Sequence, residues 1–232
     1  MLAPIRPESK FFAHLIMAFL NKTKDFYNTE LLLMPAKRNK WNEDLVSYIS
    51  RKEPSIRFID EPVEEKGQRG HHIYMNELAK HAKGDWIMNF CDDMDILLRD
   101  WDEVIREFIR SKELDPEQCF MIIPTFEVAG AVEHILSRGW LETVGCNFNY
   151  PNGDSWLNTV VEKTPEIFKK TRVLSLPTTM FEDYSHKEQY FHLFESTTKG
   201  ETKEKEDWNS PEVQSGIWEA SKKLFEAFEN GR

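Results

Sequence analysis

The sequence predicts an α/β fold in which helices cover both faces of a mostly parallel central sheet. Between residues 1 and 124, short apolar runs alternate with segments whose apolar residues recur at helical spacing. The connections between them are short, which is typical of parallel strands joined through helices. The run Gly84–Phe90 is mostly apolar, begins with a glycine and leads directly into carboxylates. A run of this kind indicates a buried strand whose carboxyl end faces a ligand.

The first half of the chain contains five predicted strands and four predicted helices. The strands are expected at residues 1–5, 30–34, 55–60, 84–90 and 119–124. The helices are expected at residues 8–21, 41–52, 101–111 and in a segment that begins at His71. Apolar residues fall on one face of each helix, as Leu15, Ile16 and Phe19 do in the first of them.

From Thr125 the alternation is less regular. Helices are predicted at residues 133–145 and 154–169, and a strand at 172–176. A last helix is expected to run to Glu229, with Ser210 as its cap and Pro211 at its first position. We therefore expect one catalytic domain over residues 1–198, with halves at 1–124 and 125–198. A charged segment and an amphipathic helix follow at 199–232, and the helix would pack on the domain or on a second subunit of a homo-oligomer.

Composition restricts the classes of function. The chain of 232 residues has a formal net charge of −10, which disfavours nucleic acid as a partner because phosphate binding needs a basic face. No run of about 18 apolar residues is present, so no transmembrane segment is expected, and the first residues do not resemble a signal peptide. The three cysteines, Cys91, Cys119 and Cys146, are widely spaced and odd in number. They predict a reducing, cytoplasmic location.

Three carboxylates follow the predicted strand at Gly84–Phe90: Asp92, Asp93 and Asp95. Neighbouring carboxylates repel one another unless a cation, hydrogen bonds or water relieve them. Oxygen ligands on a short turn suit Mn²⁺ or Mg²⁺, which also bind the phosphate oxygens of a substrate. An alternative stays open, in which the acidic turn serves only as the start of the following helix.

Several short motifs occur in a fixed order around this turn. They are Asn76–Lys80, Gly84–Ile87, Asp92–Asp95 and Trp101–Asp102. In this order they resemble the central signature of nucleotide-sugar glycosyltransferases with the GT-A fold. The resemblance implies a Rossmann-like GT-A fold and metal-dependent transfer of a sugar from a nucleotide-diphosphate donor, most commonly a UDP-hexose. It leaves the acceptor open as a glycan, a protein or a lipid-linked group.

The resemblance also implies roles for individual residues. Asp93 and Asp95 would hold the metal at the donor diphosphate, with His186 as a third ligand and His192 as its alternative. Asp92 would hydrogen-bond the ribose of the nucleotide. The other expected nucleotide contacts are Pro4, Arg6, Arg69 and Asn76. The chain lacks the Asp that similar enzymes often place after the second strand.

A second carboxylate of interest lies in the other half of the chain. Ser137–Trp140 and then Asp154–Leu157 resemble the acceptor side of some GT-A enzymes, where the Asp before the helix is the catalytic base. The resemblance therefore implies that Asp154 takes the proton of the acceptor hydroxyl, with inversion at the anomeric carbon. Asp154 is also a good residue for capping the helix that follows, and the two roles can coexist.

Two other classes of function stay open from the sequence. A nucleotidyltransferase also places paired carboxylates and Mg²⁺ beside a sugar nucleotide, but it usually has a glycine-rich loop near its start, and Met1–Lys10 contains no glycine. A non-catalytic module that binds a glycan or a partner could use the same fold without turnover.

Overall fold

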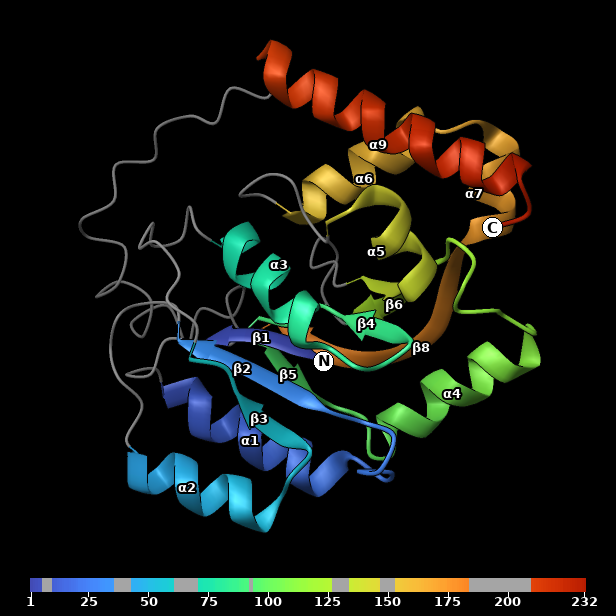
Figure 1. The fold of residues 1–232 in the computed structure, drawn as a ribbon. Helices are drawn as coiled ribbons and strands as arrows, with labels where there is room; N and C mark the ends of the chain where they lie inside the picture. Colours follow the sequence, from blue (N-terminus) through green and yellow to red (C-terminus); the bar gives the residue numbers. More distant parts are fainter. Residues whose placement is uncertain are drawn as a thin grey trace.

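The structure is a computed structural model that describes most of the chain (Figure 1). The described residues are 1–5, 10–35, 43–60, 71–91, 94–126, 134–146, 153–183 and 210–232. The strands are β1 (Leu2–Ile5), β2 (Leu31–Pro35), β3 (Ile56–Phe58), β4 (Trp86–Met88), β5 (Met94–Ile96), β6 (Met121–Phe126), β7 (Ile135–Ser137) and β8 (Val173–Asp183). The helices are α1 (Lys10–Lys22), α2 (Glu43–Lys52), α3 (His71–His81), α4 (Trp101–Ser111), α5 (Arg138–Val144), α6 (Gly153–Lys163), α7 (Glu166–Arg172) and α9 (Pro211–Glu229).

The predicted α/β class is confirmed, and the first sheet is wholly parallel. Its strand order is β1-β2-β3, with Leu2 opposite Leu32 and Leu31 opposite Ile56. Helices α1, α2 and α3 connect or follow these strands, as the alternation of apolar runs predicted. A single parallel bridge from Leu2 to Asn89 brings β4 alongside β1 and so joins the two sheets.

The second sheet is mixed, which the simple alternation of strands and helices did not predict. Its order is β4-β7-β6-β8-β5, and only the β6–β8 pairing is parallel. The helix predicted over residues 133–145 is wrong in its first part, because Ile135–Ser137 forms β7 between β4 and β6. Pairing on both sides outweighs the local helical pattern there. Helix α5 begins only at Arg138, where the Ser137 side chain accepts a hydrogen bond from the Trp140 N–H.

The helix predicted over residues 154–169 is also divided. Helix α6 ends at Lys163, and α7 begins at Glu166 after Pro165. Proline has no N–H and its ring collides with the preceding turn, so it ends a helix rather than continuing it. The strand that follows, β8, is 11 residues long and curves along the second sheet (Figure 1).

Two apolar cores lie on opposite faces of the sheets. Alternate strand residues point to opposite sides, so Leu32 joins one core and Leu31 and Leu33 join the other. The first core packs against α3, α5, α6 and α9, and the second against α1 and α4. Figure 1 shows the same division, with α3, α5, α6 and α9 above the sheets and α1 and α2 below.

Helix α9 belongs to the first core. Val213, Ile217, Ala220 and Leu224 are buried in it, and the Ser221 hydroxyl donates to the Val160 carbonyl of α6 over 2.8 Å. Of the two expectations for this helix, packing on the domain is therefore observed. The apolar stripe that could have met a second subunit is covered by the chain itself.

Glu30, which precedes β2, ties the amino ends of several elements together. Its carboxylate accepts hydrogen bonds from Arg57 of β3 over 2.8 Å and from the Lys83 N–H before β4 over 2.6 Å. Burial pushes the pKa of Glu30 upward, but these hydrogen bonds and the charge of Arg57 outweigh it, so the pKa lies below its usual value of 4.5.

The lowered pKa of Glu30 predicts a pH dependence of stability. A carboxyl whose pKa is lower in the folded state stabilises the fold above its unfolded pKa and loses that contribution as the pH falls through the folded value. We expect Glu30→Gln to lower the free energy of unfolding more at pH about 7 than at pH about 3, because the contribution of the native carboxylate decreases as the pH falls. Urea unfolding at both pH values checks this. An equal loss at both would contradict it.

Candidate functional site

The acidic turn lies between β4 and β5, where the two sheets meet. Asn89 is fully buried and bridges Leu2 of β1, and the Phe90 N–H donates to the Leu2 carbonyl over 2.9 Å. Since β1 and β4 run parallel, their carboxyl ends lie at the same edge. The backbone of Pro4, a predicted nucleotide contact, therefore lies at the edge where the chain enters the turn. Asp92 and Asp93 themselves lie outside the described residues.

Asp95 is not part of the turn but the central residue of β5. Its backbone is opposite Glu182 of β8, and the residue is only 6% exposed. The Asp95 Oδ1 atom lies 3.2 Å from His14 Nε2 and 3.7 Å from Lys22 Nζ, both on α1. Lys22 also donates to the backbone carbonyl of Ile96. Helix α1 thus places positive charge beside a carboxylate for which the sequence predicted a metal.

The ion pairs of Asp95 predict a stabilising role that is separate from metal binding. We expect Asp95→Asn to lower the free energy of unfolding by about 1–3 kcal/mol, because Lys22 and His14 lose a buried charged partner. The matched control is Asp100→Asn, which removes an exposed carboxylate five residues further on and should change stability little. Urea unfolding measures both. If Asp95→Asn is as stable as the native protein, the stabilising role is wrong. The Mn²⁺ affinity of the folded variant separately tests the predicted role of Asp95 as a metal ligand.

Asp154 lies in the first turn of α6, one residue after the helix begins at Gly153. It is therefore inside the helix and not at the capping position before it. The same helix packs into the first core through the buried side chains of Trp156, Leu157 and Val160. The backbone at position 154 is thus held on the face of the sheets that also carries α3.

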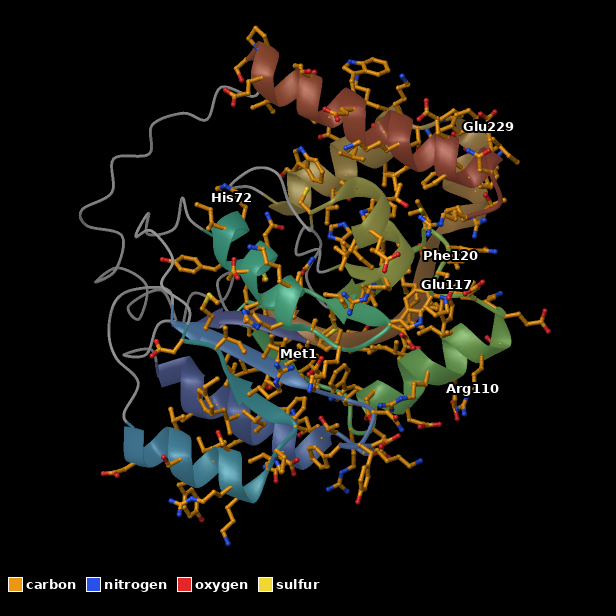
Figure 2. All side chains as sticks on the ribbon, viewed as in Figure 1. Met1, His72, Arg110, Glu117, Phe120 and Glu229 are labelled. Carbon is orange, nitrogen blue, oxygen red and sulfur yellow. The ribbon has the colours of Figure 1, made fainter. Side chains whose placement is uncertain are left out.

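Asn76 lies on α3, which packs against β1 and β2. Tyr74, Met75, Leu78 and Ala79 turn into the first core, and Asn76 is half-buried beside them. Figure 2 marks the amino end of this helix at His72. The other predicted site residues lie outside the described part of the chain: Arg6, Arg69, His186 and His192.

Two polar residues near this site were not predicted from the sequence. His134, which precedes β7, is only 1% exposed, and its Nε2 atom lies 3.1 Å from Asn158 Oδ1 on α6. Its backbone carbonyl accepts from the Asn89 N–H over 3.2 Å. A single histidine in Ala-Val-Glu-His-Ile-Leu forms no motif, and the segment was expected to be helical. Only the pairing of β4 with β7 reveals that it lies opposite the strand that leads into the acidic turn.

A cavity of about 640 Å³ opens at the other end of the strands. It is lined by residues at the amino ends of β1, β3 and β4 and by α4. Its arginines are paired with its own carboxylates, Arg57 with Glu30 and Arg106 with Asp102, each over 2.8 Å. Because it lies at the amino ends of the strands, the cavity is on the side opposite the carboxyl end of β4. The two ion pairs balance the charges of its arginines.

Among the residues described, no group of three or more His, Cys, Asp or Glu side chains is placed to hold a metal ion. The ligand atoms that the sequence offers nevertheless suit Mn²⁺ or Mg²⁺, since the segment between β4 and β5 contains the carboxylates of Asp92 and Asp93. The Asp95 Oδ1 atom lies close to two basic groups, so Asp93 is the better candidate of the two predicted carboxylate ligands. In the described part of the chain, no helix is both long and apolar enough to cross a membrane.

Comparison with known proteins agrees with this arrangement. No protein-family model and no curated protein matches the chain, but solved structures do. The mannosyltransferase PcManGT from Pyrobaculum calidifontis, in complex with GDP-Man and Mn²⁺, is 11% identical over 99% of this chain and 73% of its own, with a TM-score of 0.59. Residues 1–349 of S. aureus TarS are 12% identical over 97% of this chain and 71% of theirs, with a TM-score of 0.60. GalNAc-T7 with UDP, GalNAc and Mn²⁺ is 12% identical over 78% of this chain and 43% of its own, with a TM-score of 0.56.

These likenesses show the fold that the sequence predicted, the GT-A type of glycosyltransferases. The chain spans between 37% and 73% of the lengths of such neighbours, the smaller share being that of a longer TarS chain. TarS has also been solved with UDP-GlcNAc. The identities are low, so these likenesses establish a shared fold and do not identify the substrate.

Proposed function

We propose that the protein is a metal-dependent glycosyltransferase that moves a sugar from a nucleotide-diphosphate donor to an acceptor hydroxyl. The observation that carries the proposal is the position of Asn89, after which Asp92 and Asp93 follow in the sequence. Asn89 follows β4 and is bridged to β1, where the two sheets meet, in a fold shared with glycosyltransferases whose structures hold UDP or GDP-Man with Mn²⁺. A UDP-hexose is the first donor to test, and GDP-mannose the second.

In this proposal the donor binds to the half formed by residues 1–124. Asp93 and Asp95 would hold the divalent metal, with His186 or His192 as the third ligand, and Asp92 would hydrogen-bond the ribose. Pro4, Arg6, Arg69 and Asn76 border the nucleotide. When bound, the metal stabilises the negative charge that develops on the departing diphosphate.

The acceptor binds to the half formed by residues 125–198, with α9 packed behind it. Asp154 takes the proton of the attacking hydroxyl, which increases the nucleophilicity of the oxygen as it approaches the anomeric carbon. A base on the side opposite the leaving diphosphate gives inversion. The transition state at the anomeric carbon resembles an oxocarbenium ion, so proton removal and bond breaking have to occur in one geometry.

A thermal-shift panel tests this function. We expect UDP, UDP-GlcNAc, GDP or GDP-mannose to raise the melting temperature with Mn²⁺ and to have little effect with EDTA. At a ligand concentration about 100 times Kd the gain is about 2.7 kcal/mol, or about 5–10 °C for a chain of this size. Asp93→Asn should abolish the metal-dependent shift. If no nucleotide in the panel stabilises the protein in Mn²⁺, the proposal is wrong.

Release of the nucleoside diphosphate separates an enzyme from a binding module. We expect slow hydrolysis of the stabilising donor by water, and faster release when a suitable acceptor is added. Stabilisation without any turnover would instead favour a non-catalytic binding module.

A further inference from the structure

We propose that His134 is a positioning residue that sets the distance between the carboxyl end of β4 and the first turn of α6. The proposal rests on the function proposed above, since it concerns the two groups that act on donor and acceptor. His134 precedes β7 and contacts both Asn89, which follows β4, and Asn158 of α6; Figure 1 shows β4 and α6 in the fold.

One contact of His134 is with the strand that leads to the turn. β4 and β7 are antiparallel, with Met88 opposite Ile135, and the hydrogen bond from the Asn89 N–H to the His134 carbonyl extends this pairing by one residue. Asn89 is fully buried and is also bridged to Leu2. Asp92 comes three positions after Asn89, so the backbone of His134 contacts the strand end from which the predicted site residues follow.

The other contact is with the helix of the proposed base. The ring Nε2 of His134 is 3.1 Å from Asn158 Oδ1, and Asn158 is four residues after Asp154. Residues four apart lie on the same face of a helix, one turn from each other. A side chain of the sheet therefore holds α6 at one turn from position 154.

The burial of His134 makes this link specific. A polar ring that is 1% exposed needs hydrogen-bond partners, so its orientation is fixed by the groups around it. Hydrogen bonds are directional, whereas contacts between apolar side chains are not, so the His134–Asn158 contact adds a directional restraint to the apolar packing of α6. This restraint limits the movement of α6, and a displacement of about 1 Å in a reacting group can lower a rate about a hundredfold.

Variants of this contact provide the test. His134→Leu removes the hydrogen bond and retains apolar bulk, while His134→Gln keeps donor and acceptor atoms at a similar reach. Trp156, Leu157 and Val160 still hold α6 in the core, so we expect both variants to fold. The probe is Mn²⁺-dependent release of nucleoside diphosphate from UDP-GlcNAc or GDP-mannose, whichever stabilises the native protein. Kinetics give kcat and KM, and calorimetry gives the Kd of the donor.

For His134→Leu we expect kcat to fall about tenfold to a hundredfold while the Kd of the donor is unchanged. His134→Gln should recover most of the lost kcat. Asn158→Leu should have the same effect as His134→Leu, and the double variant should be no worse than either single one, because both remove one shared contact. The matched control is Ser221→Ala, which removes a buried hydrogen bond to α6 at Val160, further from the proposed base. It should lower stability and leave kcat unchanged.

Two results would overturn the proposal. One is an unchanged kcat in His134→Leu, and the other is an equal loss of kcat in Ser221→Ala, which would indicate general loosening of α6. Amide hydrogen exchange without donor distinguishes this failure from failure of the proposed function. If His134 links the two elements, His134→Leu raises exchange in peptides covering residues 86–91 and 153–160 and His134→Gln does not. Unchanged exchange in both peptides contradicts the link even if the native protein binds no donor.

Discussion

Replacing Asp154 by Asn is expected to lower the rate of sugar transfer about 100-fold to 10,000-fold while donor binding is retained. The amide has nearly the shape of the carboxylate but cannot accept the proton of the attacking hydroxyl. The donor is expected to bind in the other half of the site, so the Kd of the nucleotide sugar should stay at its native value. Release of nucleoside diphosphate measures the rate, and calorimetry in the presence of Mn²⁺ measures the Kd of the nucleotide sugar.

Glu162→Gln is the control for this variant. Glu162 lies on the same helix and is exposed. Its replacement by Gln removes the same charge as the replacement of Asp154 by Asn. It should have native activity, which would show that removing an acidic charge from α6 is harmless by itself. Weak donor binding in Asp154→Asn, or an undiminished rate, would count against Asp154 as the base.

The largest loss of stability is expected from Gly139→Ala. Gly139 is the second residue of α5, and a Cβ atom there would lie 2.1 Å from the Glu117 carbonyl oxygen and 2.5 Å from its carbon. Figure 2 shows Glu117 and Phe120 in the segment that leads from α4 to β6. The atoms that the Cβ would meet are backbone atoms, so either α5 or the turn that contains Glu117 has to move. We expect a loss of about 3 kcal/mol or more in the free energy of unfolding, or at least about 6 °C in melting temperature.

Gly84→Ala is the matched control. The nearest atom to a Cβ at Gly84 is the Trp86 carbonyl oxygen at 3.4 Å, which is an ordinary contact. Its loss of stability should therefore be small. If both glycine variants unfold at the same temperature, the close packing of α5 against the Glu117 backbone does not determine the stability of the fold.

Much of the first half of the fold could be predicted from the sequence. The helix at Trp101–Ser111 was predicted to the residue, and the first strands were placed correctly, because their apolar patterns are strong and local. The second half could be predicted less well, since β7 is only three residues long and owes its existence to pairing with β4 and β6. No local pattern separates such a strand from the start of a helix.

The site could be predicted only as a set of motifs. Runs such as Asp92–Asp95 are visible because the acids are adjacent in sequence, but whether each side chain meets a metal or a protein group depends on distant residues. Asp95 illustrates this, since its neighbours His14 and Lys22 lie about 70 to 80 positions earlier in the chain. His134 and Asn158 were not predicted for the same reason, as their contact exists only in three dimensions.

Anomalous diffraction from crystals soaked with Mn²⁺ and UDP, or with GDP if that nucleotide is the one that binds, tests the central claim most directly. We expect one manganese peak between β4 and β5, about 2.0–2.3 Å from a carboxylate oxygen of Asp93, with the diphosphate on its open side. A nucleotide bound elsewhere, with no manganese at residues 92–95, would contradict the proposed function.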